Sequence, residues 1–261
     1  MNAQQRYFFD LTGFLHLESV LTKDQLAKAR AAAEKYINTP TDQLPVDMGL
    51  EIDRRRYTNS FAFHKDLETL ATLPAMRRII GELTYGKPRL TMGTLMRVKH
   101  DDNRDAHSLH SAGDEQGRDK VWLCYEDGKL RSNNFAVFVY LTDVFPGDGG
   151  VILVSGSHKS NCKRDKDFFG TDSFDTYEEL PPPIVNITPK AGDVLVMPEA
   201  LTHGALPWQP EDRERWVVIL RYGIKDTPMN FKKSNVSTNE CPPYPEKWNQ
   251  TLSPETLELV R

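Results

Sequence analysis

The second half of this chain consists of short apolar runs that glycine and proline interrupt at close intervals. The runs are rich in β-branched and aromatic residues, which are typical of β-strands. Many short strands joined by glycine- and proline-containing turns favour a sandwich or barrel. We therefore expect strands over residues 89–98, 121–125, 135–141, 150–154, 184–187, 193–197 and 216–222.

Before these runs the pattern is helical. Residues 22–37 are rich in alanine, and Thr22 and Gln25 have the spacing of a capping box. Residues 66–83 predict a second helix that Pro74 interrupts or precedes. A chain of 261 residues can bury one core, so we expect one mainly β domain with three parts. They are a helical buttress over residues 1–88, a β core over 89–225 and a C-terminal wrap over 226–261.

Two polar connections, residues 100–120 and 160–183, are longer than the usual loop between strands. Ordered loops of this length often cover a binding site. We expect both to border a site, with a flexible surface insertion as the alternative for the second.

Charge and composition exclude several classes of protein. The net charge is −4 without a long basic block, so we expect no nucleic-acid partner. No apolar run is long enough to span a bilayer, and the polar first residues do not resemble a signal peptide. Cys124, Cys162 and Cys241 lie far apart, which favours ordinary thiols over a disulfide framework or a zinc site. We expect a cytoplasmic protein that contacts no membrane.

Two histidines and an arginine lie beside apolar runs of the predicted β core and are candidates for binding a ligand. His110 occurs in the sequence Leu-His-Ser-Ala-Gly, His203 follows the apolar run 193–197, and Arg215 directly precedes the run 216–222. Imidazole is a common ligand of iron. A guanidinium group matches a carboxylate through two parallel hydrogen bonds. These residue types are therefore compatible with a metal ion and a carboxylate ligand, but their roles follow only from a family resemblance.

These segments resemble the phytanoyl-CoA dioxygenase family of iron(II)- and 2-oxoglutarate-dependent oxygenases. Residues 7–15, and residues 141–159 with their glycine turn and Gly-Ser-His-Lys corner, are also similar to that family in order and spacing. The resemblance implies a double-stranded β-helix, a jelly-roll or cupin-like core with N-terminal helices packed against it. It implies that His110 and His203 bind Fe(II), that Arg215 binds 2-oxoglutarate, and that O2 is consumed with a small-molecule substrate.

The chain departs from the family at Ala112. The family pattern His-x-Asp has an aspartate two residues after the first histidine, and Ala112 stands at that place. In the wider superfamily, an alanine or glycine there is typical of halogenases, in which a halide occupies the vacated position. We therefore expect Ala112 to mark an open halide site, and the enzyme to be a halogenase that uses chloride or bromide.

Three alternatives remain open. A carboxylate from Asp114, Glu115 or Asp102 could complete the metal site, which would make the protein a hydroxylase. The literal string His100-Asp101-Asp102 could replace His110 in the motif. A cupin-like binding protein without catalytic activity is the third alternative.

Other candidates have structural interpretations. Trp122, Tyr125, Phe138 and Tyr140 could line a pocket or belong to the core. We expect His16 to pack, His158 to hold a turn and Arg213 to belong to a charged loop.

Overall fold

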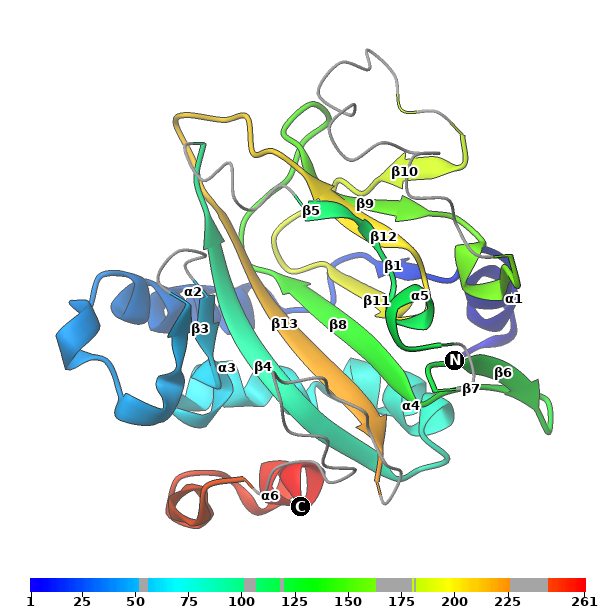
Figure 1. The fold of residues 1–261 in the computed structure, drawn as a ribbon. Helices are drawn as coiled ribbons and strands as arrows, with labels where there is room; N and C mark the ends of the chain where they lie inside the picture. The colour runs from blue at the N-terminus through cyan, green and yellow to red at the C-terminus, as the bar shows by residue number, and fades with distance from the viewer. Residues whose placement is uncertain (52–55, 101–106, 118–119, 163–179, 181, 226–243) are drawn as a thin grey trace.

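The computed structural model describes the chain except for residues 52–55, 101–106, 118–119, 163–179, 181 and 226–243. Two antiparallel sheets that face each other, with helices on one side, form the molecule (Figure 1).

The larger sheet has seven strands in the order β1-β11-β8-β13-β4-β3-β2. Strands β8, β13 and β4 are its long central members (Figure 1). Their sequences are nearly continuous apolar runs because both faces of these strands are covered. The strands are β1 (Leu15–Leu17), β2 (Leu50–Glu51), β3 (Arg56–Thr58), β4 (Pro88–Val98), β8 (Asn134–Tyr140), β11 (Val194–Pro198) and β13 (Arg215–Ile224).

The smaller sheet has four strands in the order β10-β9-β12-β5. They are β5 (His107–His110), β9 (Gly150–Val154), β10 (Ile184–Asn186) and β12 (His203–Leu206). A separate hairpin joins β6 (Leu123–Glu126) to β7 (Lys129–Ser132).

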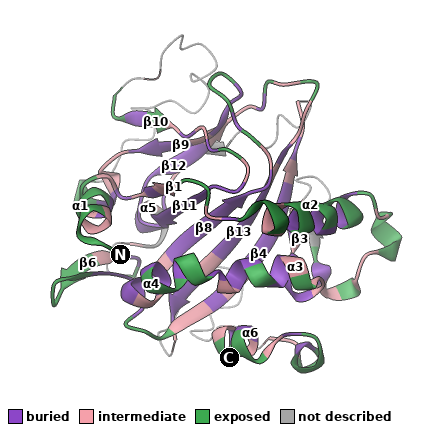
Figure 2. Cartoon of the chain, turned by 180° about the vertical axis from the view of Figure 1, so that it is seen from behind, coloured by how far each residue is buried: buried purple, intermediate pink, exposed green. Residues whose placement is uncertain are grey.

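The helices α2, α3 and α4 cover the outer face of the larger sheet (Figure 2). In α2, Thr22 and Gln25 form the expected capping box. Pro74 begins α4, which explains why the expected helix over 66–83 is divided. Among the described residues, no helix is both long and apolar enough to cross a membrane. The helices are α1 (Ala3–Thr12), α2 (Lys23–Ile37), α3 (Lys65–Glu68), α4 (Pro74–Leu83), α5 (Ala112–Gln116) and α6 (Pro254–Val260).

The alternation of side chains along β13 separates two cores. Val218 and Leu220 pack with the helices, whereas Val217 and Ile219 pack with Leu153 of the smaller sheet. Successive residues of a strand point to opposite faces. The second core therefore fills the space between the two sheets, and the residues on this inner face are placed to form a site.

All seven expected strands are confirmed within a few residues. The interpretation of residues 100–120 as one loop is wrong, because β5 and α5 lie inside it. The N-terminal 88 residues also contribute three strands as well as helices. These strands are too short to show a period of two in the sequence. In the C-terminal segment, Trp248 is buried and packs edge-on against Phe61, 5.5 Å between ring centroids.

Candidate functional site

Strands β5 and β12 bring His110 and His203 together. The two residues are direct partners in the antiparallel ladder, and their ring centroids lie 4.3 Å apart with the planes at 54°. His203 also pairs with Leu153, whose side chain belongs to the core between the sheets. Cross-strand partners share a face, so both imidazoles belong to the inner face of the smaller sheet.

The surroundings of His203 keep its imidazole neutral. The side chain is 7% exposed, and Nδ1 lies 2.8 Å from the carbonyl oxygen of Leu201. Burial lowers the pKa of His203 to about 4, an effect that Glu199 opposes and His110 adds to. Donation from Nδ1 to Leu201 leaves Nε2 with its lone pair, which is the form that binds a metal.

Ala112 begins helix α5 directly after the histidine strand. The hydroxyl of Ser111 caps this helix by accepting from the N–H of Asp114. Ala112 is 9% exposed and packs with Val121 and Ala200. The chain therefore places a methyl group, in apolar surroundings, two residues after His110.

Only one of the three expected replacement carboxylates, Asp114, has a side chain that the structure describes. Asp114 is partly exposed in α5. The side chain of Glu115 and the whole of Asp102 lie outside the described residues. Asp102 as a ligand, and the literal string at His100, remain untested predictions.

Glu199 is a carboxylate near the histidines that the sequence did not reveal. It follows β11 and is 7% exposed, and its Oε2 lies 4.0 Å from Nε2 of His203. Its other oxygen, Oε1, accepts a hydrogen bond of 2.9 Å from Nε of Arg221. The signal in the sequence was a glutamate at the end of a fully buried apolar strand, four residues before His203.

Burial alone would raise the pKa of Glu199. The charges of Arg221 and the two histidines lower this pKa by more than burial raises it. The net direction is downward, so this buried carboxyl group is ionised at neutral pH.

Arg215 lies at the other end of the inner face. It begins β13, is 3% exposed, and its Cζ lies 5.7 Å from the ring centroid of Trp208. Gly150 of β9 lies beside the guanidinium group, because a Cβ added there would be 2.7 Å from Nη1. Arg215 therefore reaches from the larger sheet to the smaller one.

Tyr140 adds a polar group near Arg215. Tyr140 pairs with Val217, so it shares the inner face with Arg215 two residues earlier. Its side chain is 1% exposed, and its hydroxyl has no hydrogen-bond partner among the described residues. Burial raises the pKa of Tyr140 and the charge of Arg215 opposes this. A buried hydroxyl without a partner is costly, so the site has an unused donor beside a buried cation.

The residue spacing along β9 gives the approximate distance between the histidines and Arg215. His203 pairs with Leu153, and Arg215 contacts the position of Gly150. Three residues of a strand span about 10 Å. A short dicarboxylate that is held near the histidines could therefore reach Arg215.

His16 and His158 make contacts that hold the fold together. His16 lies 2.8 Å from a carboxylate oxygen of Asp193, and buried His158 lies 3.0 Å from the carbonyl oxygen of Asp10. His100 is exposed on its side chain and lies 3.8 Å from Glu211. Of the two motif candidates, His110 is the one that contacts His203.

Of the four aromatic candidates, Phe138 and Tyr140 belong to the inner core. Tyr125 is exposed on the separate hairpin, and Arg213 lies in the charged loop and pairs with Asp148 at 2.5 Å.

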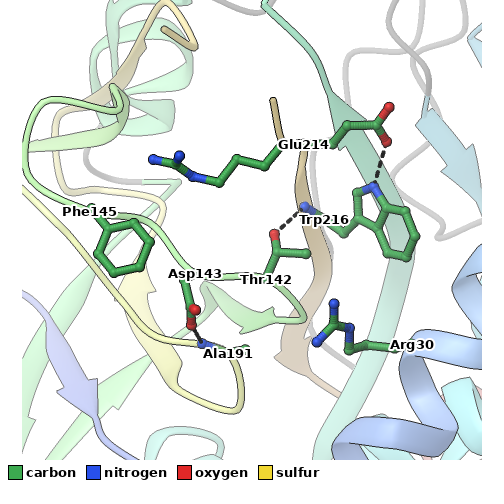
Figure 3. Close-up of a pocket in the computed structure, with 8 residues that line it drawn as sticks. Arg30, Thr142, Asp143, Phe145, Ala191, Glu214 and Trp216 are labelled. Atoms are coloured by element: carbon green, nitrogen blue, oxygen red, sulfur yellow. Dashed lines mark hydrogen bonds between the residues drawn. The ribbon is translucent and has the colours of Figure 1, made fainter. Parts of the chain in front are cut away.

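Glu214 holds the segment that leads into Arg215. Its carboxylate accepts from Arg97 at 2.6 and 2.7 Å and from Nε1 of Trp216 at 2.8 Å. Figure 3 shows this contact and the bond of the Trp216 N–H to Thr142, beside a hollow of about 310 Å³. Neither His110, His203 nor Arg215 lines this hollow, so it is separate from the site between the sheets.

We expect Glu214→Gln to destabilise the protein by about 1–2 kcal/mol at pH 7, after allowance for solvent screening. Burial raises the pKa of Glu214, but Arg97, Trp216 and Lys99 lower it to about 2 from 4.5. This contribution is present above pH 4.5 and is lost as the pH falls toward 2. Urea unfolding of the metal-free protein should show a smaller difference at pH 3 than at pH 7. An equal difference at both would contradict the role of the charge.

Among the described residues, no three His, Cys, Asp or Glu side chains are already gathered as a complete metal site. His203 nevertheless lies beside His110, and its Nε2 is 4.0 Å from the carboxylate of Glu199. Their donors, neutral imidazole and carboxylate, are those that suit a divalent transition metal with open positions. The residues present therefore fit such an ion.

Comparison with known proteins gives consistent matches. The family model described as phytanoyl-CoA dioxygenase matches residues 9–214. An ectoine dioxygenase from Streptomyces coelicolor is 22% identical over 151 residues, which cover 58% of this chain and 49% of the relative. The match thus spans about half the length of that curated relative.

Solved structures share the fold. HygX from Streptomyces hygroscopicus, with nickel and 2-oxoglutarate bound, superposes with a TM-score of 0.71 at 25% identity, covering 91% of this chain and 92% of HygX. EctD from S. alaskensis, with 2-oxoglutarate and 5-hydroxyectoine, gives a TM-score of 0.66 at 21% identity, with 86% and 76% covered.

Proposed function

Because this chain belongs to the phytanoyl-CoA dioxygenase family, we propose that it is an iron(II)- and 2-oxoglutarate-dependent oxygenase. The observation that carries the proposal is the facing pair of His110 and His203, with buried Arg215 on the opposite sheet. The substrate is a small molecule.

His110 and His203 would hold the iron. The hydrogen bond from Nδ1 of His203 to Leu201 orients that ring and directs Nε2 to the metal. Because the pKa of His203 is lowered, its ring is unprotonated at neutral pH, so protons would not compete with the metal for Nε2. Both histidines lie on strands rather than loops, which fixes their separation.

Arg215 would bind the distal carboxylate of 2-oxoglutarate. The hydroxyl of Tyr140, which has no partner among the described residues, is placed to donate a second hydrogen bond to the same carboxylate. Gly150 matters here because it leaves space beside Nη1 of Arg215. The ring of Trp208 covers the guanidinium group and helps to exclude water.

The bound iron and 2-oxoglutarate supply the oxidising chemistry, in which 2-oxoglutarate and O2 are converted to succinate and carbon dioxide while a substrate C–H bond is oxidised. The chain orients the cosubstrate through Arg215 and Tyr140. Its apolar inner core, which includes Met197 and Leu201, keeps bulk water away.

We infer that the two sheets form a double-stranded β-helix. Eight strands, ordered β11-β8-β13-β4 and β10-β9-β12-β5, enclose the inner core. This two-sheet arrangement of eight antiparallel strands is that of a jelly roll.

Between the two reaction outcomes, we propose oxygenation. The place beside Ala112 is lined by apolar Val121 and Ala200, and the ionised carboxylate of Glu199 lies near His203. A nearby anion disfavours a halide. The second candidate, halogenation, is supported by the absence of a carboxylate at Ala112 itself and would require chloride or bromide.

Anaerobic titration of Fe(II) and 2-oxoglutarate tests both candidates. We expect the visible charge-transfer band of the iron chelate, unchanged by chloride, and O2-dependent succinate formation. A band that shifts or tightens with chloride would support the halogenase. If neither cofactor binds, the protein is a cupin-like binding protein and the proposal is wrong.

A further inference from the structure

We propose that Glu199 supplies the carboxylate of the metal site, from β11, in place of the one that Ala112 lacks. This inference rests on the proposed function, because it concerns the iron that His110 and His203 would hold. It differs from the family pattern, in which the carboxylate follows the first histidine.

The geometry places Glu199 within reach of the metal. A transition metal takes nitrogen and oxygen donors at about 2.0–2.2 Å, so two donors of one ion lie at most about 4.4 Å apart. Oε2 of Glu199 and Nε2 of His203 are 4.0 Å apart. The side chain therefore needs only a small movement to share an ion with His203.

The backbone brings Glu199 directly to the position that lacks a carboxylate. The N–H of Ala112 donates to the carbonyl oxygen of Glu199 at 2.8 Å. Leu195 and Met197 of β11 point into the inner core, and Glu199 is the next residue in this alternation. Thus Glu199 continues the inner face of β11 and reaches the same corner as Ala112.

Arg221 prepares the carboxylate for this role. Arg221 lies on β13 and donates from Nε to Oε1 at 2.9 Å. This bond leaves Oε2 as the oxygen toward His203. A carboxylate held in this way offers Oε2 as an oxygen donor to a divalent ion.

No other described carboxylate makes a comparable contact with the histidines. Asp114 is partly exposed, and its helix begins with Ala112. Arg221 binds only Oε1 of Glu199, so Oε2, which faces His203, can take a further partner. A metal ion would provide that partner.

Metal titration of variants of the full chain tests the inference. We expect Glu199→Gln to weaken Co(II) binding by more than about 100-fold, since even outer partners of metal ligands change affinity by 10- to 100-fold. In the Glu199→Ala background, Ala112→Asp should restore much of the affinity, because it returns a carboxylate to the same corner. Calorimetry follows binding, and the d–d spectrum of Co(II) reports the ligand set without any turnover.

Glu82→Gln is the matched control. Glu82 is also a buried carboxylate held by an arginine, Arg6, but it lies in α4 on the other side of the larger sheet. Its removal should leave Co(II) affinity and spectrum unchanged. A thermal melt of each variant separates loss of binding from loss of fold.

The outcomes distinguish this inference from the proposed function. If the wild type binds Co(II) and Glu199→Gln binds it equally well with the same spectrum, the inference is wrong and the proposed function stands. If the wild type binds no Co(II), Fe(II) or 2-oxoglutarate, the proposed function fails and the inference fails with it.

Discussion

Replacement of His203 by alanine should abolish tight metal binding and all 2-oxoglutarate turnover. The change removes the metal-binding nitrogen, and no neighbouring side chain among the described residues can take its place on β12. Loss of a direct ligand should exceed the 10- to 100-fold that outer partners contribute. We therefore expect Co(II) or Fe(II) affinity to fall by more than about 100-fold, measured by calorimetry under anaerobic conditions.

The paired variants sharpen this experiment. His110→Ala should have the same effect, because His110 is the direct cross-strand partner of His203. His100→Ala is the matched control, since His100 is half-exposed and faces Glu211. Loss of metal binding in His100→Ala with retention in His110→Ala would overturn the assignment and support the literal His-x-Asp string.

Arg215→Ala should cause the second large effect, a loss of affinity for 2-oxoglutarate without a loss of affinity for the metal. Removal of one partner from a buried, hydrogen-bonded charge pair costs about 2–5 kcal/mol. We expect 2-oxoglutarate affinity to fall by roughly 30-fold to several-thousand-fold, with Co(II) affinity unchanged. Titration of 2-oxoglutarate into the metal-loaded protein measures this directly.

Two comparisons control for charge and location. Arg215→Lys keeps the charge but loses the planar fork, so it should recover only part of the affinity. Arg213→Ala removes a cation two residues away that is partly exposed and paired with buried Asp148. Equal losses for Arg213→Ala and Arg215→Ala would show that general charge, and not a specific carboxylate contact, holds 2-oxoglutarate.

The two arginines on the inner face of β13, Arg215 and Arg221, would interact with different carboxylates. Under the proposed function Arg215 would bind the carboxylate of 2-oxoglutarate at one end, whereas Arg221 holds the protein's own carboxylate, Glu199, at the other. They are six residues apart, so they share a face of the strand, at a distance of about 20 Å. This separation lets one strand serve both the cosubstrate and the metal.

The sequence by itself predicted the strands and the helix over 22–37, and its resemblance to the family singled out His110, His203 and Arg215. These features are local: apolar runs between glycines and prolines, a capping pair, and polar residues at the ends of apolar strands. Strand β5 was not visible because its four residues, His107–His110, contain a single apolar residue, Leu109, and form no apolar run.

Only the tertiary structure decided which carboxylate lies near the histidines. Glu199 and Ala112 are far apart in the sequence, and the strand order β11-β8-β13 in one sheet with β12-β5 in the other brings them together. Orientation across the space between two sheets depends on pairing register, which is a long-range property. Closeness in sequence to His110 or to the alternative His100 therefore favoured Asp114, Glu115 and Asp102 over Glu199.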